Sequence, residues 1–163
     1  MYNVSIIGKS RTGKSSLRSQ WSGQSFSESY CSTIFVEVHQ MDSMIMYEIP
    51  NPCREPVVQY YEHTDVFVLV VRKDATRHDA YERLCRLYRD ASWLMVFNGP
   101  GEFPKSRLYA TNRGLSMARV NLKTGMGVTE SLRVLQELTQ LHRQRPMPVS
   151  LLDEVYQWIP ACV

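Results

Sequence analysis

The sequence has no long hydrophobic run, and none of its apolar stretches approaches the ~18 residues that a membrane-spanning helix needs. Its first residues form a strand-like pattern from Tyr2 and lack the basic and then apolar regions of a secretory signal. The 19 Lys and Arg side chains, set against 16 Asp and Glu, are scattered, so the net charge of +3 predicts no nucleic-acid binding. We therefore expect a cytoplasmic protein without a transmembrane segment.

The sequence has no cluster of cysteines, and their spacing indicates no metal site. Cys31, Cys53, Cys85 and Cys162 form no C-x-x-C pair and have no histidine at zinc-ligand spacing. Free thiols in a reducing compartment are the simpler interpretation. Prenylation needs a cysteine fourth from the end or a terminal pair, and the final residues are Ala161-Cys162-Val163, so we expect no stable membrane anchoring. Acylation of Cys162 stays open.

Strand-like and helix-like patterns alternate along the 163 residues. Residues 66–71 and 93–97 are apolar at every position, which is typical of parallel strands covered on both faces. Apolar side chains recur at helical spacing across 80–88 and 128–138. This order predicts a three-layer α/β domain with a mostly parallel sheet of about six strands and flanking helices. The expected strands cover 2–7, 33–40, 43–49, 66–71, 93–97 and 116–122, the second and third forming a hairpin, with a short helix before the last strand.

The chain can bury one sizeable core, which predicts one main domain over 1–145. A proline hinge at 146–148 separates it from a tail over 146–163. In this tail an apolar stripe at helical spacing ends at Pro160, which predicts a short amphipathic helix over 149–159. We expect the helix to pack on the main domain and the protein to be a monomer, with partner binding or dimerisation as the alternative. The stripe consists of Leu151, Leu152, Val155, Trp158 and Ile159.

One motif carries most of the chemical information. Residues 8–15 follow the pattern G-x-x-x-x-G-K-[ST] directly after the first expected strand, and a helix-compatible segment over 15–21 follows them. This is the phosphate-binding P-loop, also called Walker A. Lys14 is expected to reach the β- and γ-phosphates, while the Ser15 hydroxyl ligates Mg²⁺ where the helix dipole favours anions. The expected phosphate contacts are Gly8, Ser10, Arg11, Thr12, Gly13, Lys14, Ser15 and Ser16.

Further segments resemble the Ras-like small GTPases, and within them the Rab branch. The loop and the Ser16-Leu17 that follows it look like the Rab pattern, and Tyr30-Cys31-Ser32-Thr33-Ile34 is similar to switch I. Residues 65–70 resemble the fourth strand, and 122–128 look like the segment that leads into the last helix. The resemblance covers roughly residues 1–142. It implies a P-loop NTPase G domain that binds GTP or GDP with Mg²⁺, Thr33 closing over the γ-phosphate and ligating the metal.

The chain departs from the family after the third expected strand. Where the family has Asp-x-x-Gly-Gln, the sequence reads Glu48-Ile49-Pro50-Asn51-Pro52. Glu48 can still carry charge to the metal's second coordination shell, although its side chain is one methylene longer than aspartate. Pro52 occupies the place of the glutamine that orients the attacking water, so the sequence identifies no catalytic residue and predicts very slow hydrolysis. The short interval between Thr33 and Glu48 implies a clipped hairpin.

The base-recognition motif is also altered. Where the family has Asn-Lys-x-Asp, this chain has Asn98-Gly99-Pro100-Gly101, so guanine selectivity is in doubt. Glu102 is a candidate displaced carboxylate, the alternative being a solvated loop charge. The backbone N–H near Leu122 can meet a base carbonyl, and the stem of Lys123 can lie along the base.

These observations predict a divergent Rab-like GTP-binding protein, a Mg²⁺-dependent switch and weak GTPase that meets a protein effector or regulator through its switch regions. A pseudo-GTPase that acts only as a binding module is the first alternative. A P-loop ATPase or kinase-like protein is the second, with Asp74 after the buried strand as its Walker B aspartate. Arg11 could place a built-in charge on the γ-phosphate, but exposure to solvent is the simpler expectation.

Overall fold

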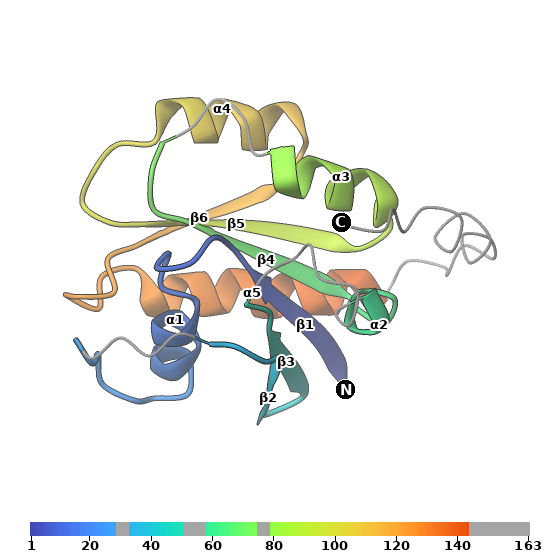
Figure 1. The fold of residues 1–163 in the computed structure, drawn as a ribbon, viewed down its shortest axis with the longest axis horizontal. Helices are drawn as coiled ribbons and strands as arrows, with labels where there is room; N and C mark the ends of the chain where they lie inside the picture. Colours follow the sequence, from blue (N-terminus) through green and yellow to red (C-terminus); the bar gives the residue numbers. More distant parts are fainter. Residues whose placement is uncertain (29–32, 51–57, 75–78, 144–163) are drawn as a thin grey trace.

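The computed structural model describes residues 1–28, 33–50, 58–74 and 79–143. Figure 1 shows one sheet with helices on both faces. The strands are β1 (Tyr2–Ile7), β2 (Glu37–Met41), β3 (Met44–Glu48), β4 (Val66–Val71), β5 (Ser92–Asn98) and β6 (Ser116–Val120). The helices are α1 (Lys14–Trp21), α2 (Val58–Tyr61), α3 (Asp79–Leu87), α4 (Pro104–Asn112) and α5 (Val128–Arg143).

The six strands lie in the order β2-β3-β1-β4-β5-β6. Only the β2–β3 pair is antiparallel, and the other pairs are parallel. After β1 the chain builds β2 and β3 on one side and then returns past β1 to form β4 on the other. Because open α/β sheets bind ligands at the carboxyl edge where the strand order reverses, the loop after β1 lies at the favoured position.

Apolar side chains form a core on each face of the sheet. The first cluster joins β1 and β4 to α1 and α5, with Leu17, Trp21 and Leu135 contributed by the helices. The second joins the opposite face to α3 and α4, with Tyr81, Leu84 and Ala110 from these helices. Strands β4 and β5 are buried at every position, as expected for strands with helices on both faces. Apolar side chains therefore cover both faces of the central strands.

The prediction of an α/β domain with a six-stranded, mostly parallel sheet is confirmed, as is the hairpin. Met41 pairs with Met44, so only two residues connect β2 and β3. Strand β2 begins four residues later than expected, because its first residue, Glu37, already pairs with Glu48, where β3 ends. Strand β6 ends earlier than expected, since Asn121 turns to pair with Met126. The four-residue α2 was not predicted, because it is too short to show a helical period.

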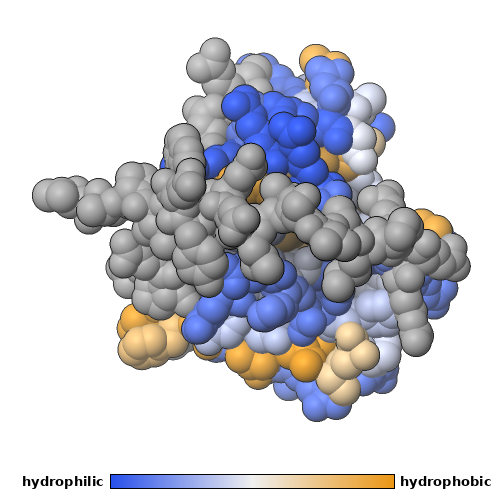
Figure 2. Space-filling model, turned by 90° about the vertical axis from the view of Figure 1, so that its right-hand side faces the viewer, coloured by the Kyte–Doolittle hydropathy of each residue, from blue (hydrophilic) through white to orange (hydrophobic). Residues whose placement is uncertain are grey.

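Several predictions concern residues outside the described ranges. The tail over 146–163, its expected helix over 149–159, Asn51 and Pro52 all lie there. Within the described ranges, none of the helices combines the length and apolar character required to cross a bilayer. The face in Figure 2 is largely hydrophilic where it is coloured, and hydrophobic residues gather toward its lower margin.

Candidate functional site

The loop between β1 and α1 is wrapped around a buried lysine. Lys14 is only 7% exposed, and its Nζ donates to the carbonyl oxygens of Gly8 at 3.1 Å and Lys9 at 3.4 Å. An ammonium group has three N–H donors, so a third remains for a ligand beyond these two carbonyls. Burial lowers the pKa of Lys14, an effect that the negative charge of Glu48 opposes. The loop therefore holds a cation at the first turn of α1, where the helix dipole also favours an anion.

The loop conformation depends on Gly13, the residue that precedes α1. Gly13 has φ +100°, and its carbonyl accepts the first helical hydrogen bond from Leu17 N at 2.8 Å. A Cβ at this position would lie 2.6 Å from Asn98 Nδ2 and 2.8 Å from Leu122 Cδ1. Only glycine fits both the left-handed conformation and this close approach.

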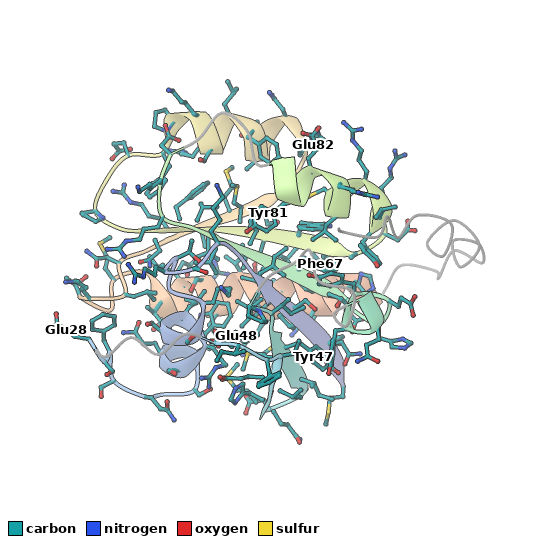
Figure 3. The ribbon with its side chains drawn as sticks, viewed as in Figure 1. Glu28, Tyr47, Glu48, Phe67, Tyr81 and Glu82 are labelled. Carbon is teal, nitrogen blue, oxygen red and sulfur yellow. The ribbon has the colours of Figure 1, made fainter. Side chains whose placement is uncertain are left out.

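Three side-chain oxygens converge beside Lys14. The Ser15 hydroxyl donates to Glu48 Oε1 in a short hydrogen bond, and Thr33 Oγ1 donates to the same oxygen at 3.1 Å. The Ser15 and Thr33 hydroxyl oxygens are 3.4 Å apart. Figure 3 shows Glu48 beside α1, where β3 ends. Mg²⁺ prefers an all-oxygen octahedral shell at about 2.0–2.1 Å, in which neighbouring oxygens lie about 3 Å apart, so this donor set fits Mg²⁺.

Glu48 is held on its other side by an arginine of α1. Its side chain is 1% exposed, and Oε2 accepts a hydrogen bond from Arg18 Nε at 3.3 Å. Arg18 lies three residues after Ser15, on the same face of the helix, so both contact the one carboxylate. A buried carboxylate requires such a partner, because desolvation penalises an unpaired charge.

Asn98, at the end of β5, connects two loops. Its Nδ2 donates to the Thr12 carbonyl at 2.8 Å, and its Oδ1 accepts from Leu122 N at 3.4 Å. The Leu122 amide expected to meet a base carbonyl is therefore bonded to Asn98. Gln20 of α1 further fixes this loop through a 2.7 Å bond to the Leu122 carbonyl. Asn98 thus connects the loop between β1 and α1 to the 121–123 loop.

A cavity of about 770 Å³ joins these groups. Its volume lies within the range of small-molecule and cofactor sites. Three expected site residues, Gly8, Thr12 and Glu102, are not in its lining. Gly8 and Thr12 contribute to the loop through their carbonyl oxygens, which accept hydrogen bonds from Lys14 Nζ and Asn98 Nδ2 respectively. The expected residues that do line it are Ser10, Arg11, Gly13, Lys14, Ser15, Ser16, Thr33, Glu48, Asn98, Leu122 and Lys123.

Two carboxylates singled out from the sequence lie elsewhere. Glu102 is 74% exposed and pairs with Arg119 Nη1 at 3.2 Å, beside a smaller hollow of about 240 Å³. Asp74 accepts hydrogen bonds from the backbone amides of Ser106 at 2.8 Å and Lys105 at 3.3 Å, in the first turn of α4. Burial acts to raise the pKa of Asp74, but the hydrogen bonds outweigh it and lower the pKa. Asp74 thus caps a helix.

Sequence reasoning missed several residues of the cavity lining. Arg72 follows β4 and donates from Nη1 to the Arg11 carbonyl at 3.5 Å. Its place after a buried strand that neighbours β1 could have indicated this position. Phe26 and Glu28 carry no comparable local signal, because they reach the cavity only through the path of the chain after α1. Glu28 lies 3.6 Å from Lys123 Nζ, which places this segment against the 121–123 loop.

No protein-family model matches the chain, and no curated protein matches it. In the described ranges, His, Cys, Asp and Glu do not come together in threes at any place that could hold a metal. The donor set beside Lys14 is of another kind, because two of its three side chains are hydroxyls.

Proposed function

We propose that this chain is a divergent Rab-like small GTP-binding protein that holds a nucleotide with Mg²⁺ in the cavity at the carboxyl edge of β1. The buried ammonium of Lys14, held by loop carbonyls at the start of α1, is the observation that carries the proposal. A cation held there without an ion pair within the loop is suited to a phosphate chain, which would use the third N–H. The finer fold that we propose is the P-loop NTPase G domain.

Ser15 and Thr33 are the residues that we expect to hold Mg²⁺, with Glu48 supporting them. The Ser15 and Thr33 hydroxyl oxygens lie 3.4 Å apart, and Thr33 Oγ1 lies 3.1 Å from Glu48 Oε1. Both distances are close to the spacing of about 3 Å between neighbouring oxygens in an octahedral Mg²⁺ shell. When bound, the cation would neutralise phosphate charge. Thr33 belongs to the segment between α1 and β2, so a ligand that engages its hydroxyl also positions that segment. The neighbouring Ile34 and Phe35 are exposed, and we propose them as contacts for an effector or regulator.

The base would lie at the other end of the cavity, between Phe26 and the 121–123 loop. An aromatic face and the apolar stem of Lys123 offer stacking surfaces that any nucleobase can use. The Leu122 amide is bonded to Asn98, and Glu102 lies outside the lining. We therefore expect guanine nucleotides to bind with less discrimination against adenine than in ordinary family members.

A pseudo-GTPase is the second candidate, and the observation that favours it is the position of Pro50. Pro50 lines the cavity directly after Glu48 and Ile49, at the place where the family has a mobile segment. Its ring restricts φ and so stiffens this segment, and the next residue, Asn51, stands where the family has the glycine whose N–H meets the γ-phosphate. Such a chain would bind a nucleotide without hydrolysing it and would present a surface to a partner protein.

The decisive experiment is to denature the purified protein and identify any released nucleotide by chromatography. Protein that has been freed of its nucleotide should then resist thermal unfolding better when Mg²⁺ and GTP are added. At a ligand concentration of 100 times Kd the gain is about 2.7 kcal/mol, or roughly 5–10 °C in Tm. Lys14→Ala should abolish the shift, whereas Lys9→Ala, which removes an exposed side chain of the same loop, should retain it. An equal shift in wild type and Lys14→Ala would refute the proposal.

A further inference from the structure

Glu48 divides its two carboxylate oxygens between different partners. Oε1 accepts from the hydroxyls of Ser15 and Thr33, and Oε2 accepts from Arg18. The carboxylate is 1% exposed, so water contributes almost nothing to its solvation. The contacts with Arg18, Ser15 and Thr33 therefore decide which carboxylate oxygen of Glu48 faces the two hydroxyls.

Arg18 is itself held in place from β2. Its side chain is 14% exposed, and the guanidinium lies 3.3 Å from His39 Nδ1 and 3.7 Å from Glu37 Oε2. His39 Nε2 lies 3.2 Å from the same Glu37 carboxylate, so the tautomer with its hydrogen on Nε2 satisfies both contacts. A continuous set of hydrogen bonds thus runs from the outer strand of the sheet to the hydroxyls beside Lys14.

We propose that Arg18 is a positioning residue for the metal-binding oxygens. It fixes the Glu48 carboxylate so that Oε1 holds the hydroxyls of Ser15 and Thr33 in place before nucleotide and Mg²⁺ arrive. The inference deepens the proposed function and rests on it. It concerns a residue that the sequence did not single out: Arg18 lines the cavity and contacts Glu48, and the inference is that it acts on the cation through this carboxylate.

The length of the glutamate side chain explains why an anchor is needed. Compared with aspartate, glutamate has one more rotatable bond, and freezing it costs conformational entropy. Unanchored, the carboxylate could rotate its oxygens away from Ser15 and Thr33. Arg18 supplies a planar cation whose Nε–H contacts Oε2 while the other nitrogens contact β2. Residues that orient ligands in this manner typically change metal affinity 10- to 100-fold when they are replaced.

The test is a Mg²⁺ titration of nucleotide release from the full chain, followed with a fluorescent GDP analogue. We expect Arg18→Met to raise the Mg²⁺ concentration for half-maximal retention about 10- to 100-fold. Arg18→Lys should recover part of the loss, because it restores the charge without the planar group. Arg86→Met is the matched control, since it removes an exposed arginine from a Glu82 ion pair outside the cavity lining and should leave the titration unchanged.

A double-mutant cycle separates this role from general destabilisation. If Arg18 acts through Glu48, Arg18→Met should shift the Mg²⁺ midpoint little further in a Glu48→Gln background. Unfolding in EDTA, without nucleotide, records whether each variant is folded, and Arg18→Lys serves for the comparison if Arg18→Met is not. An unchanged midpoint in Arg18→Met, or full additivity with Glu48→Gln, overturns the inference while leaving nucleotide binding intact. A wild-type chain that retains no nucleotide at any Mg²⁺ concentration overturns both proposals.

Discussion

At the scale of single residues, Gly13 is the position where the site tolerates least change. A Cβ there would lie within 2.8 Å of Asn98 and Leu122, and φ is +100°. We expect Gly13→Ala to destabilise the protein by about 3 kcal/mol or more, because backbone strain and overpacking add, and to abolish nucleotide binding. Thermal unfolding and a binding titration measure the two effects.

Gly23 provides the matched control for this prediction. It also has a positive φ, +79°, but a Cβ at this position would meet no atom within 4 Å beyond its own chain neighbours. Gly23→Ala should therefore lose only about 1 kcal/mol from backbone strain and should bind nucleotide normally. Equal losses in the two variants would mean that the contacts with Asn98 and Leu122 are not what requires glycine at position 13.

Glu102 tests how the base is recognised. Because it lies outside the cavity lining and pairs with Arg119, we expect Glu102→Ala to leave the preference for GTP over ATP unchanged. Competition titrations with the two nucleotides measure this preference. If the preference disappears in the variant, the 99–102 turn reaches the base when nucleotide is bound, and Glu102 is the displaced carboxylate that the sequence indicates.

At the scale of elements, Asp74 links the end of β4 to the start of α4. Burial acts to raise its pKa, but hydrogen bonds from the Ser106 and Lys105 amides outweigh that effect and lower the pKa. Its stabilising contribution is therefore fully present above its ordinary pKa of about 3.9 and is lost as pH falls through the lower folded value. Asp74→Asn should thus be less stable than wild type at neutral pH, and the difference should shrink in strong acid.

The same variant discriminates between two roles for Asp74. A capping residue affects the unfolding midpoint and leaves nucleotide affinity alone, since Asp74 is not in the cavity lining. A Walker B aspartate would affect the Mg²⁺ dependence of binding instead. Chemical denaturation at pH 7 and pH 3, combined with a Mg²⁺ titration, separates the outcomes. A shift in the titration without a change in stability would favour the ATPase-like or kinase-like alternative.

At the scale of the whole molecule, local patterns predicted the sheet well and placed the glycine-containing loop between β1 and α1, where the structure has it. Strands β4 and β5 were evident because burial on both faces leaves a run of apolar residues. The loop was evident because its chemistry is contiguous in sequence. Thr33 lies far from Ser15 along the chain, and only a family resemblance indicated that their hydroxyls meet.

What the sequence could not predict depends on contacts between distant segments. Arg18 is one ordinary helix residue within α1, and its contact with Glu48 forms only because β3 brings that carboxylate against it. Glu102 and Asp74 follow strands at the same edge as the cavity, yet one pairs with Arg119 and the other caps α4. For charged residues near a site, helix caps and ion pairs compete with ligand binding, and local sequence does not decide between them.

The rate of hydrolysis is a property of the assembled site. The sequence has proline at position 52, where the Ras-like proteins it resembles have the glutamine that orients the attacking water, and the ring of Pro50 restricts the backbone of the cavity lining. Positioning provides most of the catalysis in this chemistry, so we expect single-turnover GTP hydrolysis no faster than the ~10⁻⁴ s⁻¹ scale of unassisted Ras. Pro52→Gln alone should recover little, because Pro50 and Asn51 remain. A faster wild-type rate would contradict this prediction and would direct attention to Arg11 and Arg72, two arginines of the cavity lining that are joined by a hydrogen bond from Arg72 to the Arg11 carbonyl. A loss of that rate in Arg72→Ala or Arg11→Ala would then identify which guanidinium stabilises the developing charge.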